Sequence, residues 1–122
     1  MPESTAPTAA LGYTCNRCEM RISWMPDVQA PELPSTWSEE GDEIYCLNCR
    51  RERAGEAGVA EMPEDTPADE RQRRRTHARI EFEIRRDPER PDNRIAKACR
   101  TSAMAVRKAR NRIGVPRGPA PR

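Results

Sequence analysis

Two Cys-x-x-Cys pairs constrain the fold of this chain more than any other feature of its sequence. The first pair is Cys15 and Cys18, the second is Cys46 and Cys49, and 27 residues separate the pairs. At this spacing a tight turn directs two thiolates toward one ion, so the two pairs together offer four sulfur ligands. The separation exceeds the usual range of about 15 to 20 residues, and a longer hairpin between the pairs accommodates the difference.

Zinc is the metal that this ligand set favours. Disulfides are one alternative, but the first ten residues lack the basic start and apolar middle of an export signal, and an intracellular chain keeps its thiols reduced. An iron–sulfur cluster is the other alternative, although two separated pairs on a hairpin suit a closed tetrahedral site better. We therefore expect a Zn2+ site that stabilises the fold, with the ligands Cys15, Cys18, Cys46 and Cys49.

The residues around the cysteines predict a small α+β zinc finger over residues 12–57. Three prolines within residues 26–34 exclude regular structure there, and Gly41-Asp42 predicts a turn that leads into a strand. The second cysteine pair leads directly into a good helix start at residues 50–54, which favours a treble-clef finger over a zinc ribbon. Trp24 and Trp37 are expected to form part of the finger's core.

Charge divides the chain into an acidic half and a basic half. Residues 1–70 carry 5 Lys and Arg against 15 Asp and Glu, and residues 71–122 carry 17 against 5, although the net charge of the whole chain is only +2. Such asymmetry predicts that the basic half meets a polyanion. Residues 58–69 have the composition of an acidic linker, and residues 1–11 that of a disordered leader.

Three helices are predicted in the basic half. The first covers residues 70–86, where the alternation from Ile80 to Ile84 also fits a strand but the flanking residues are helix formers. The second begins near Pro91, and the third starts after Ser102 and ends at Gly114. Residues 70–114 are therefore expected to form an all-α, tri-helical domain in which about three residues join the last two helices, and residues 115–122 are expected to form a basic tail.

The sequence Ile-Ala-Lys-Ala-Cys-Arg-Thr-Ser-Ala-Met-Ala-Val-Arg-Lys-Ala-Arg, at residues 95–110, resembles the helix-turn-helix segment of bacterial, phage and plasmid DNA-binding proteins. The usual pattern of that family is Ile-Ala, then Gly-Val-Ser, then Val and a basic recognition helix. The resemblance implies that Ser102 caps the recognition helix, that Val106 anchors it in the core, and that the source is a phage or a bacterium. Arg100 stands where the family has its turn glycine, so this position is either not left-handed or strained.

Positive charge without acidic neighbours indicates the residues that contact double-stranded DNA. The cations of the third helix, Arg107, Lys108, Arg110 and Arg112, have no acidic partner within that helix, so they repel one another unless an anion binds. The resemblance directs the first residues of this helix into the major groove, while its later arginines and those of residues 70–86 contact phosphate. The expected DNA-binding residues are Ala103, Met104, Arg107, Lys108, Arg110, Arg112, Arg74 and Arg75.

Two single residues have simpler interpretations. His77, the only histidine, has no second metal ligand nearby in the sequence and is expected at the surface among arginines. Cys99, the fifth cysteine, follows Ile95 by one turn on an apolar stripe and is expected to be a buried, small hydrophobic residue.

Together these features predict a sequence-specific DNA-binding protein that regulates transcription and carries a structural zinc finger. The alternative is an adaptor whose zinc finger binds a protein partner, such as RNA polymerase or a host factor, with the basic half as a DNA anchor. An enzyme is disfavoured because the chain lacks clustered carboxylates, a catalytic histidine pair and a phosphate-cradling loop. No run reaches the roughly 18 to 20 apolar residues of a membrane helix, so we expect a cytoplasmic protein. A homodimer is also compatible with the sequence.

Overall fold

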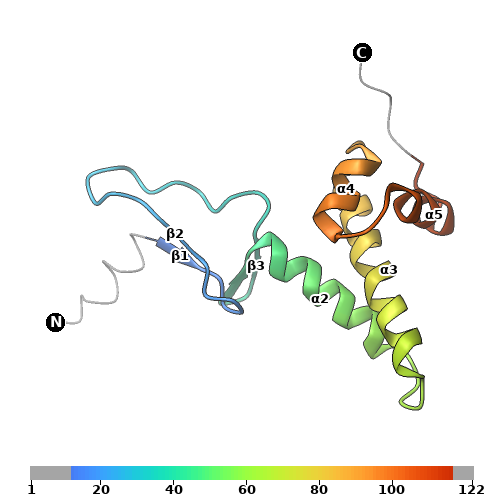
Figure 1. Ribbon diagram of the computed structural model, residues 1–122. Coiled ribbons are helices and arrows are strands. Elements are labelled where there is room, and N and C mark those ends of the chain that lie inside the picture. Colours follow the sequence, from blue (N-terminus) through green and yellow to red (C-terminus); the bar gives the residue numbers. More distant parts are fainter. Residues whose placement is uncertain (1–11, 117–122) are drawn as a thin grey trace. The chain divides into compact units, whose positions relative to one another are not determined.

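The computed structural model describes residues 12–116, so the expectations for the leader and for residues 117–122 lie outside the described residues. The described part contains four short strands and four helices (Figure 1). Contacts divide the chain into two compact units, Met1–Arg50 and Arg51–Arg122, which we call the first and the second unit. The division falls within α2, Leu47–Ala60, and therefore before residue 57, where the sequence placed the end of the finger.

The first unit contains two antiparallel hairpins. β1, Gly12–Thr14, pairs with β2, Arg21–Ser23, and β3, Ser38–Glu40, pairs with β4, Glu43–Tyr45. Gly41 turns the chain between β3 and β4 with a φ of 63°, so the predicted turn and strand at this position are confirmed. α2 begins at Leu47, directly after Cys46, and therefore adds a helix start to the two hairpins. The unit thus has the expected α+β composition.

The core of the first unit surrounds its cysteines. Trp37 is only 8% exposed and packs with Cys15, Cys46 and Cys49, which confirms its predicted place in the core. Trp24 is half-buried, and its ring lies 5.2 Å from that of Tyr13 between centroids. A core of this size is small, so the unit depends on something besides apolar burial for its stability.

The second unit contains the rest of α2 and three further helices, α3 at Ala68–Arg86, α4 at Asp92–Cys99 and α5 at Ala103–Ile113. The helix predicted for residues 70–86 is confirmed, because Ile80 and Ile84 lie one turn apart on a buried face. α4 and α5 contact each other and α3 (Figure 1), and the shared core is formed by Ile80, Ile84, Ile95, Ala96, Cys99, Val106 and Ala109. Within residues 12–116, every helix is too short or too polar to cross a membrane.

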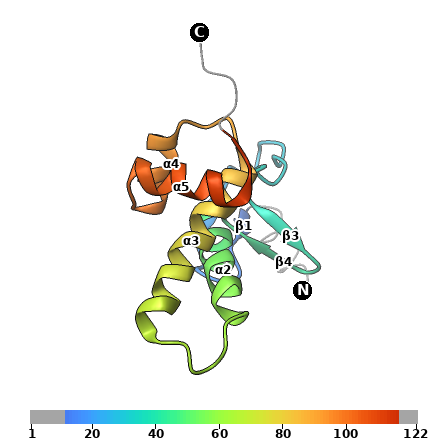
Figure 2. The ribbon, with the colours of Figure 1, turned by 90° about the vertical axis from the view of Figure 1, so that its right-hand side faces the viewer.

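α2 and α3 lie side by side (Figure 2), and two glycines of α2 permit the close approach. A Cβ atom at Gly58 would lie 2.7 Å from the Cβ of Ala78, and one at Gly55 would lie 2.9 Å from the Cγ of Arg75. Real side chains do not approach each other this closely, so the glycines mark a helix contact. Residues 58–69, which the sequence assigns to an acidic linker, comprise the end of α2, a connection and the start of α3.

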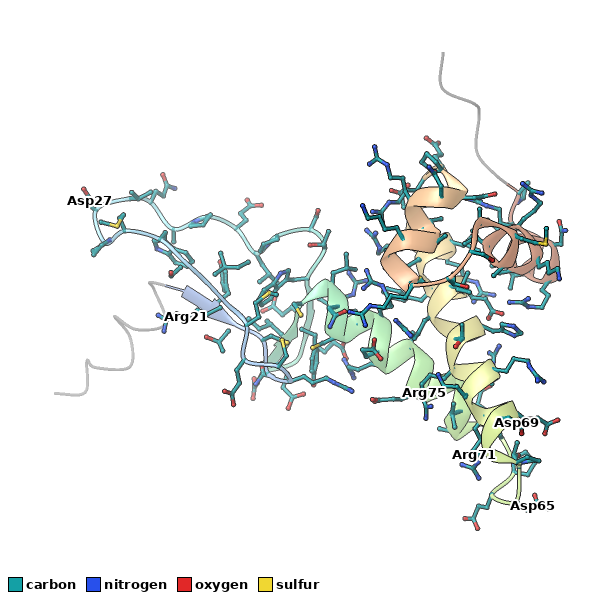
Figure 3. All side chains as sticks on the ribbon, viewed as in Figure 1. Arg21, Asp27, Asp65, Asp69, Arg71 and Arg75 are labelled. Atoms are coloured by element: carbon teal, nitrogen blue, oxygen red, sulfur yellow. The ribbon has the colours of Figure 1, made fainter. Side chains whose placement is uncertain are left out.

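Arg71 holds the connection between α2 and α3, at the lower end of Figure 3. Its Nε donates to the carbonyl oxygen of Thr66 at 3.0 Å, and its Nη2 donates to that of Pro63 at 3.3 Å and to that of Glu64. Three backbone carbonyls thus satisfy this guanidinium. The connection is therefore tied to α3 by an arginine that the charge pattern alone would assign to phosphate binding.

A buried carboxylate links α2, α3 and the segment after α3. Glu83 is completely buried, and its carboxylate accepts hydrogen bonds from Arg51 Nε at 2.8 Å and from Arg86 Nη2 at 2.9 Å. The guanidinium of Arg90 lies 3.5 Å away. Three arginines therefore converge on one acid in the interior of the second unit.

The junction between α4 and α5 is a three-residue turn with a left-handed residue. Arg100 has φ 58° and ψ 50°, and the amide of Thr101 donates to the carbonyl of Ala96 at 2.9 Å, as in a Schellman motif. Ser102 then caps α5, because its Oγ accepts from the amide of Ala105 at 3.1 Å. The predicted cap at Ser102 and the predicted helix end at Gly114, which is also left-handed, are both confirmed.

We expect Arg100→Gly to stabilise the second unit. A residue with a Cβ atom in the left-handed region costs roughly 1–2 kcal/mol, and the greater freedom of glycine in the unfolded chain offsets part of the gain, so the free energy of unfolding should rise by about 0.5–1 kcal/mol. Denaturant unfolding followed by circular dichroism measures the change. Arg100→Ala keeps the Cβ atom and serves as the control, and a glycine variant no more stable than this control would contradict the prediction.

Candidate metal centre and basic surface

The four paired cysteines converge at one point in the first unit. Their Sγ atoms all lie within 4.8 Å of one another, and those of Cys18 and Cys46 are 3.7 Å apart. Sulfur ligands about 2.3 Å from a tetrahedral ion lie about 3.8 Å from each other, so this spacing fits one metal ion. No disulfide joins these cysteines, and Figure 3 shows the sulfur atoms, in yellow, beside the start of α2.

Local structure places each ligand. Cys15 follows β1, and Cys18 lies in the tight turn that leads to β2, while Cys46 follows β4 and Cys49 lies in the first turn of α2. Asn16 joins the two ligand pairs, because its side-chain oxygen accepts from the amide of Ile44 at 2.8 Å and its own amide donates to the carbonyl of Ile44 at 2.8 Å. The backbone and side chain of Asn16 therefore fix the two cysteine pairs relative to each other.

Backbone amides point at the sulfur atoms. The amides of Arg17 and Cys46 lie 3.5 and 3.4 Å from Cys15 Sγ, and the amide of Met20 lies 3.4 Å from Cys18 Sγ. Donors in these positions stabilise thiolate rather than thiol, and thiolate is the form that binds a metal. The donor set thus fits a metal with a preference for sulfur.

The electrostatics of the cluster favour a bound cation. Burial raises the pKa of Cys15, but hydrogen bonds from the amides of Cys18, Cys46 and Arg17 outweigh it and lower this pKa to about 6. Burial and the neighbouring thiols raise the pKa values of Cys46 and Cys49 above the ordinary 9.0. The thiols therefore resist ionising together, and a divalent ion at their centre would remove that resistance.

Arg110 does not have the surface position that a phosphate contact requires. It is only 4% exposed, its Nε donates to Asp92 Oδ1 at 2.7 Å, and its two terminal nitrogens donate to the carbonyls of Pro88 and Arg90 at 3.0 Å each. This corrects the expectation that Arg110 binds DNA. Its guanidinium instead ties α5 to the start of α4 and to the segment before it.

Three other expected DNA-binding cations have partners within the second unit. Arg112 and Arg74 both pair with the buried carboxylate of Glu81, at 3.3 and 3.4 Å. Arg75 donates to the side chain of Gln72 at 2.7 Å. The sequence of α5 alone therefore overestimates the uncompensated charge of this helix, because α3 and α4 supply carboxylates that pair with its arginines.

An exposed basic surface remains on α5. Met104 is 58% exposed, and Arg107 and Lys108 are exposed without an ion pair to any carboxylate of residues 12–116. Ala103, at the first position of α5, is half-buried. Figure 3 shows nitrogen-tipped side chains, in blue, projecting from α4 and α5.

Three further cations, which the sequence prediction omitted, are exposed on α4 and its turn. Arg94, Lys97 and Arg100 are exposed, and the described residues offer their side chains no carboxylate partner. Their spacing of three along α4, on the face away from the buried Ile95 and Cys99, was the sequence signal that could have identified them. We call Arg94, Lys97, Arg100, Met104, Arg107 and Lys108 the basic face.

Comparison of the chain with models of protein families, with curated proteins and with solved structures finds no match. What the chain does must therefore follow from the chemistry of its own residues. Two features carry that chemistry, namely the four-cysteine cluster of the first unit and the basic face of the second.

Proposed function

We propose that this chain is a sequence-specific DNA-binding protein that regulates transcription, and that Zn2+ at its four cysteines holds a treble-clef finger together. The observation that carries the proposal is the basic face, which lies on two short helices separated by only three residues. Uncompensated cations on such a surface suit the phosphates of duplex DNA. α5 would act as the recognition helix of a helix-turn-helix domain.

The chemistry of the exposed residues on α5 supports base recognition as well as phosphate binding. Arg107 carries donors that suit the O6 and N7 acceptors of guanine in the major groove, and Lys108, beside it, carries a charge that suits a base edge or an adjacent phosphate. Met104 is exposed and apolar near the start of α5, where it suits contact with a thymine methyl group. Together these side chains offer hydrogen-bond donors, positive charge and an apolar contact, and sequence specificity requires such a mixture.

Removal of both basic side chains tests the proposal. We expect Arg107→Ala with Lys108→Ala to weaken specific DNA binding at least about tenfold, because a good base contact contributes roughly 1–3 kcal/mol. The full chain, loaded with zinc, is first used to select its tightest duplexes from a random pool, and binding is then measured over a range of salt concentrations. A steep salt dependence and a recovered sequence motif are the expected results.

A charge-matched variant provides the control. Arg21→Ala with Arg85→Ala also removes two exposed cations, but from β2 and α3 rather than from the basic face. This control should lose much less affinity than the α5 variant. Equal losses in the two variants would show that only total charge matters and would contradict recognition by α5.

An interaction function of the zinc finger is the second candidate. Met20, Met25 and Val28 are 51%, 66% and 52% exposed, and exposed apolar side chains of this size favour contact with another protein. Here the basic face would serve only as an electrostatic anchor. Weak binding to all duplexes, with no recovered motif, would favour this candidate over site-specific recognition.

A further inference from the structure

A hollow lies between α3 and α5. Its volume of about 280 Å3 is smaller than the roughly 300–1,000 Å3 of pockets that bind organic ligands. Met104, Lys108 and Arg112 follow one another at intervals of four residues and so share the face of α5 that borders the hollow. The volume is large enough to admit a phosphate group. We call this space the α3–α5 hollow, and its lining residues are His77, Ser102, Met104, Ala105, Lys108 and Arg112.

The α3–α5 hollow is positively charged. Lys108 has no ion pair within residues 12–116. Arg112 and Arg74 share the single carboxylate of Glu81, at 3.3 and 3.4 Å, so one negative charge faces two guanidinium groups. The hollow therefore attracts an anion even when His77 is neutral.

The hydrogen-bond donors of the hollow suit an oxyanion. The Oγ of Ser102 accepts from the amide of Ala105, which leaves the hydroxyl proton free to donate. α5 begins at the next residue, and the partial positive charge of its N-terminus adds to the attraction. The ring of His77 makes no hydrogen bond within the described residues, so a protonated nitrogen could donate to a bound group.

His77 was expected at the surface among arginines, and it is half-buried. Its surroundings favour the neutral ring. Burial lowers its pKa below 6.5, the nearby charge of Arg112 lowers it further, and Glu81 opposes the effect. A second hollow, of about 220 Å3, also borders His77, and the Met62 side chain that lines it adds no charge. The charged groups around His77 are Glu70, Arg73, Arg74 and Glu81 from α3 and Lys108 and Arg112 from α5.

We propose that the α3–α5 hollow seats a backbone phosphate of bound DNA and that His77 takes up a proton from solvent when the phosphate enters. The proposal rests on the proposed DNA-binding function and adds His77 and Ser102 to the residues that contact the backbone. The proton binds a ring nitrogen, and no covalent bond to the phosphate forms. Because binding consumes a proton, affinity should rise as the pH falls from the pKa of His77 in the complex toward its lower pKa in the free chain, which lies below 6.5, and should be independent of pH well above both.

The chain has one histidine, so the imidazole resonances in the NMR spectrum report His77 alone. The zinc-loaded full chain is titrated with acid alone, with a short duplex, and with sodium sulfate or sodium chloride at equal ionic strength. Sulfate keeps a constant charge over this range of pH, unlike inorganic phosphate. We expect the duplex to raise the pKa of His77 by about one unit, which corresponds to about tenfold tighter binding at acid than at alkaline pH. Sulfate should produce a smaller shift in the same direction, and chloride none.

Variants separate this proposal from DNA binding in general. Lys108→Ala should abolish the effect of sulfate on His77, whereas Arg107→Ala, which removes a charge outside the hollow, should preserve it. His77→Gln should make DNA affinity independent of pH between about 5.5 and 8. A pH dependence that persists in His77→Gln would overturn the proposal.

Two further outcomes distinguish failure of the phosphate site from failure of the proposed function. A duplex that binds without changing the titration of His77 would overturn the phosphate site and leave DNA binding intact. A response to sulfate in a chain that binds no duplex would overturn both, and would identify the hollow as a site for a free oxyanion.

Discussion

Replacement of Cys46 by serine should unfold the first unit. Metal binding contributes an apparent free energy of roughly 10–16 kcal/mol to the folding of zinc-finger peptides. This is as large as the free energy of unfolding of a whole domain, about 5–15 kcal/mol. The core around Trp37 is too small to replace that contribution. Both tryptophans of the chain, Trp24 and Trp37, lie in the first unit, so tryptophan fluorescence reports its unfolding specifically.

The fifth cysteine offers a matched control for this experiment. Cys99 is buried in the second unit and belongs to a different core, so Cys99→Ala should retain one zinc ion per chain and the native fluorescence. Metal content is measured by elemental analysis, and a chelator added to the native chain should reproduce the effect of Cys46→Ser. A Cys46→Ser chain with native tryptophan fluorescence would contradict a structural role for the metal.

Loss of the carboxylate at Glu83 should destabilise the second unit by about 3–5 kcal/mol, because removal of one partner leaves buried charge without compensation. In the Glu83→Ala variant the guanidinium of Arg51, which is only 8% exposed, would lose the acceptor that now lies 2.8 Å away. Denaturant unfolding measured by circular dichroism gives the change. Glu89→Gln, at an exposed acid on the connection to α4, is the control and should change stability by less than about 0.5 kcal/mol.

Acid should also weaken the second unit through Glu83. Burial raises the pKa of this carboxyl, but the hydrogen bond from Arg86 and the charge of Arg51 outweigh burial, so its pKa lies below the ordinary 4.5. A lowered pKa means that the stabilisation is complete above pH 4.5 and is lost as the pH falls through the pKa of the folded state. Glu83→Gln should lack this part of the acid dependence. An identical pH profile in the two proteins would show that Glu83 does not contribute to it.

The local features of the fold could be predicted from the sequence because each depends on neighbours in the chain. The four-cysteine cluster follows from the spacing within each pair, and the turn at Gly41 follows from glycine chemistry. Ser102 and Gly114 bound α5 for the same reason, since a cap acts within one turn of its helix. The helix at residues 70–86 was harder to predict, because the alternation of apolar residues from Ile80 to Ile84 also fits a strand. The helix-forming residues around it favoured the helix.

Features that depend on contacts between distant residues could not be predicted. Gly55 and Gly58 are typical of a linker in the sequence, yet they lie in α2. They stand where α3 approaches too closely for a side chain. The acids that neutralise the arginines of α5 come from α4 and α3, 18 and 31 residues away respectively, so the pattern within α5 could not show them. His77 lines a hollow for the same reason, since α5 supplies the other wall.

The burial of Arg110 divides α5 into positions that can vary and positions that cannot. Lysine cannot replace this residue, because a single ammonium group does not reproduce the planar set of donors that meets Asp92 and two carbonyl oxygens. Residues 104, 107, 108 and 111 are exposed and make no contact with the apolar core. A library that randomises those four positions would change what the helix recognises while the scaffold persists, whereas a library that also varied position 110 would yield mostly chains that fail to fold. After gene duplication, the DNA target of such a protein could therefore change through substitutions at the exposed positions, while position 110 stays arginine.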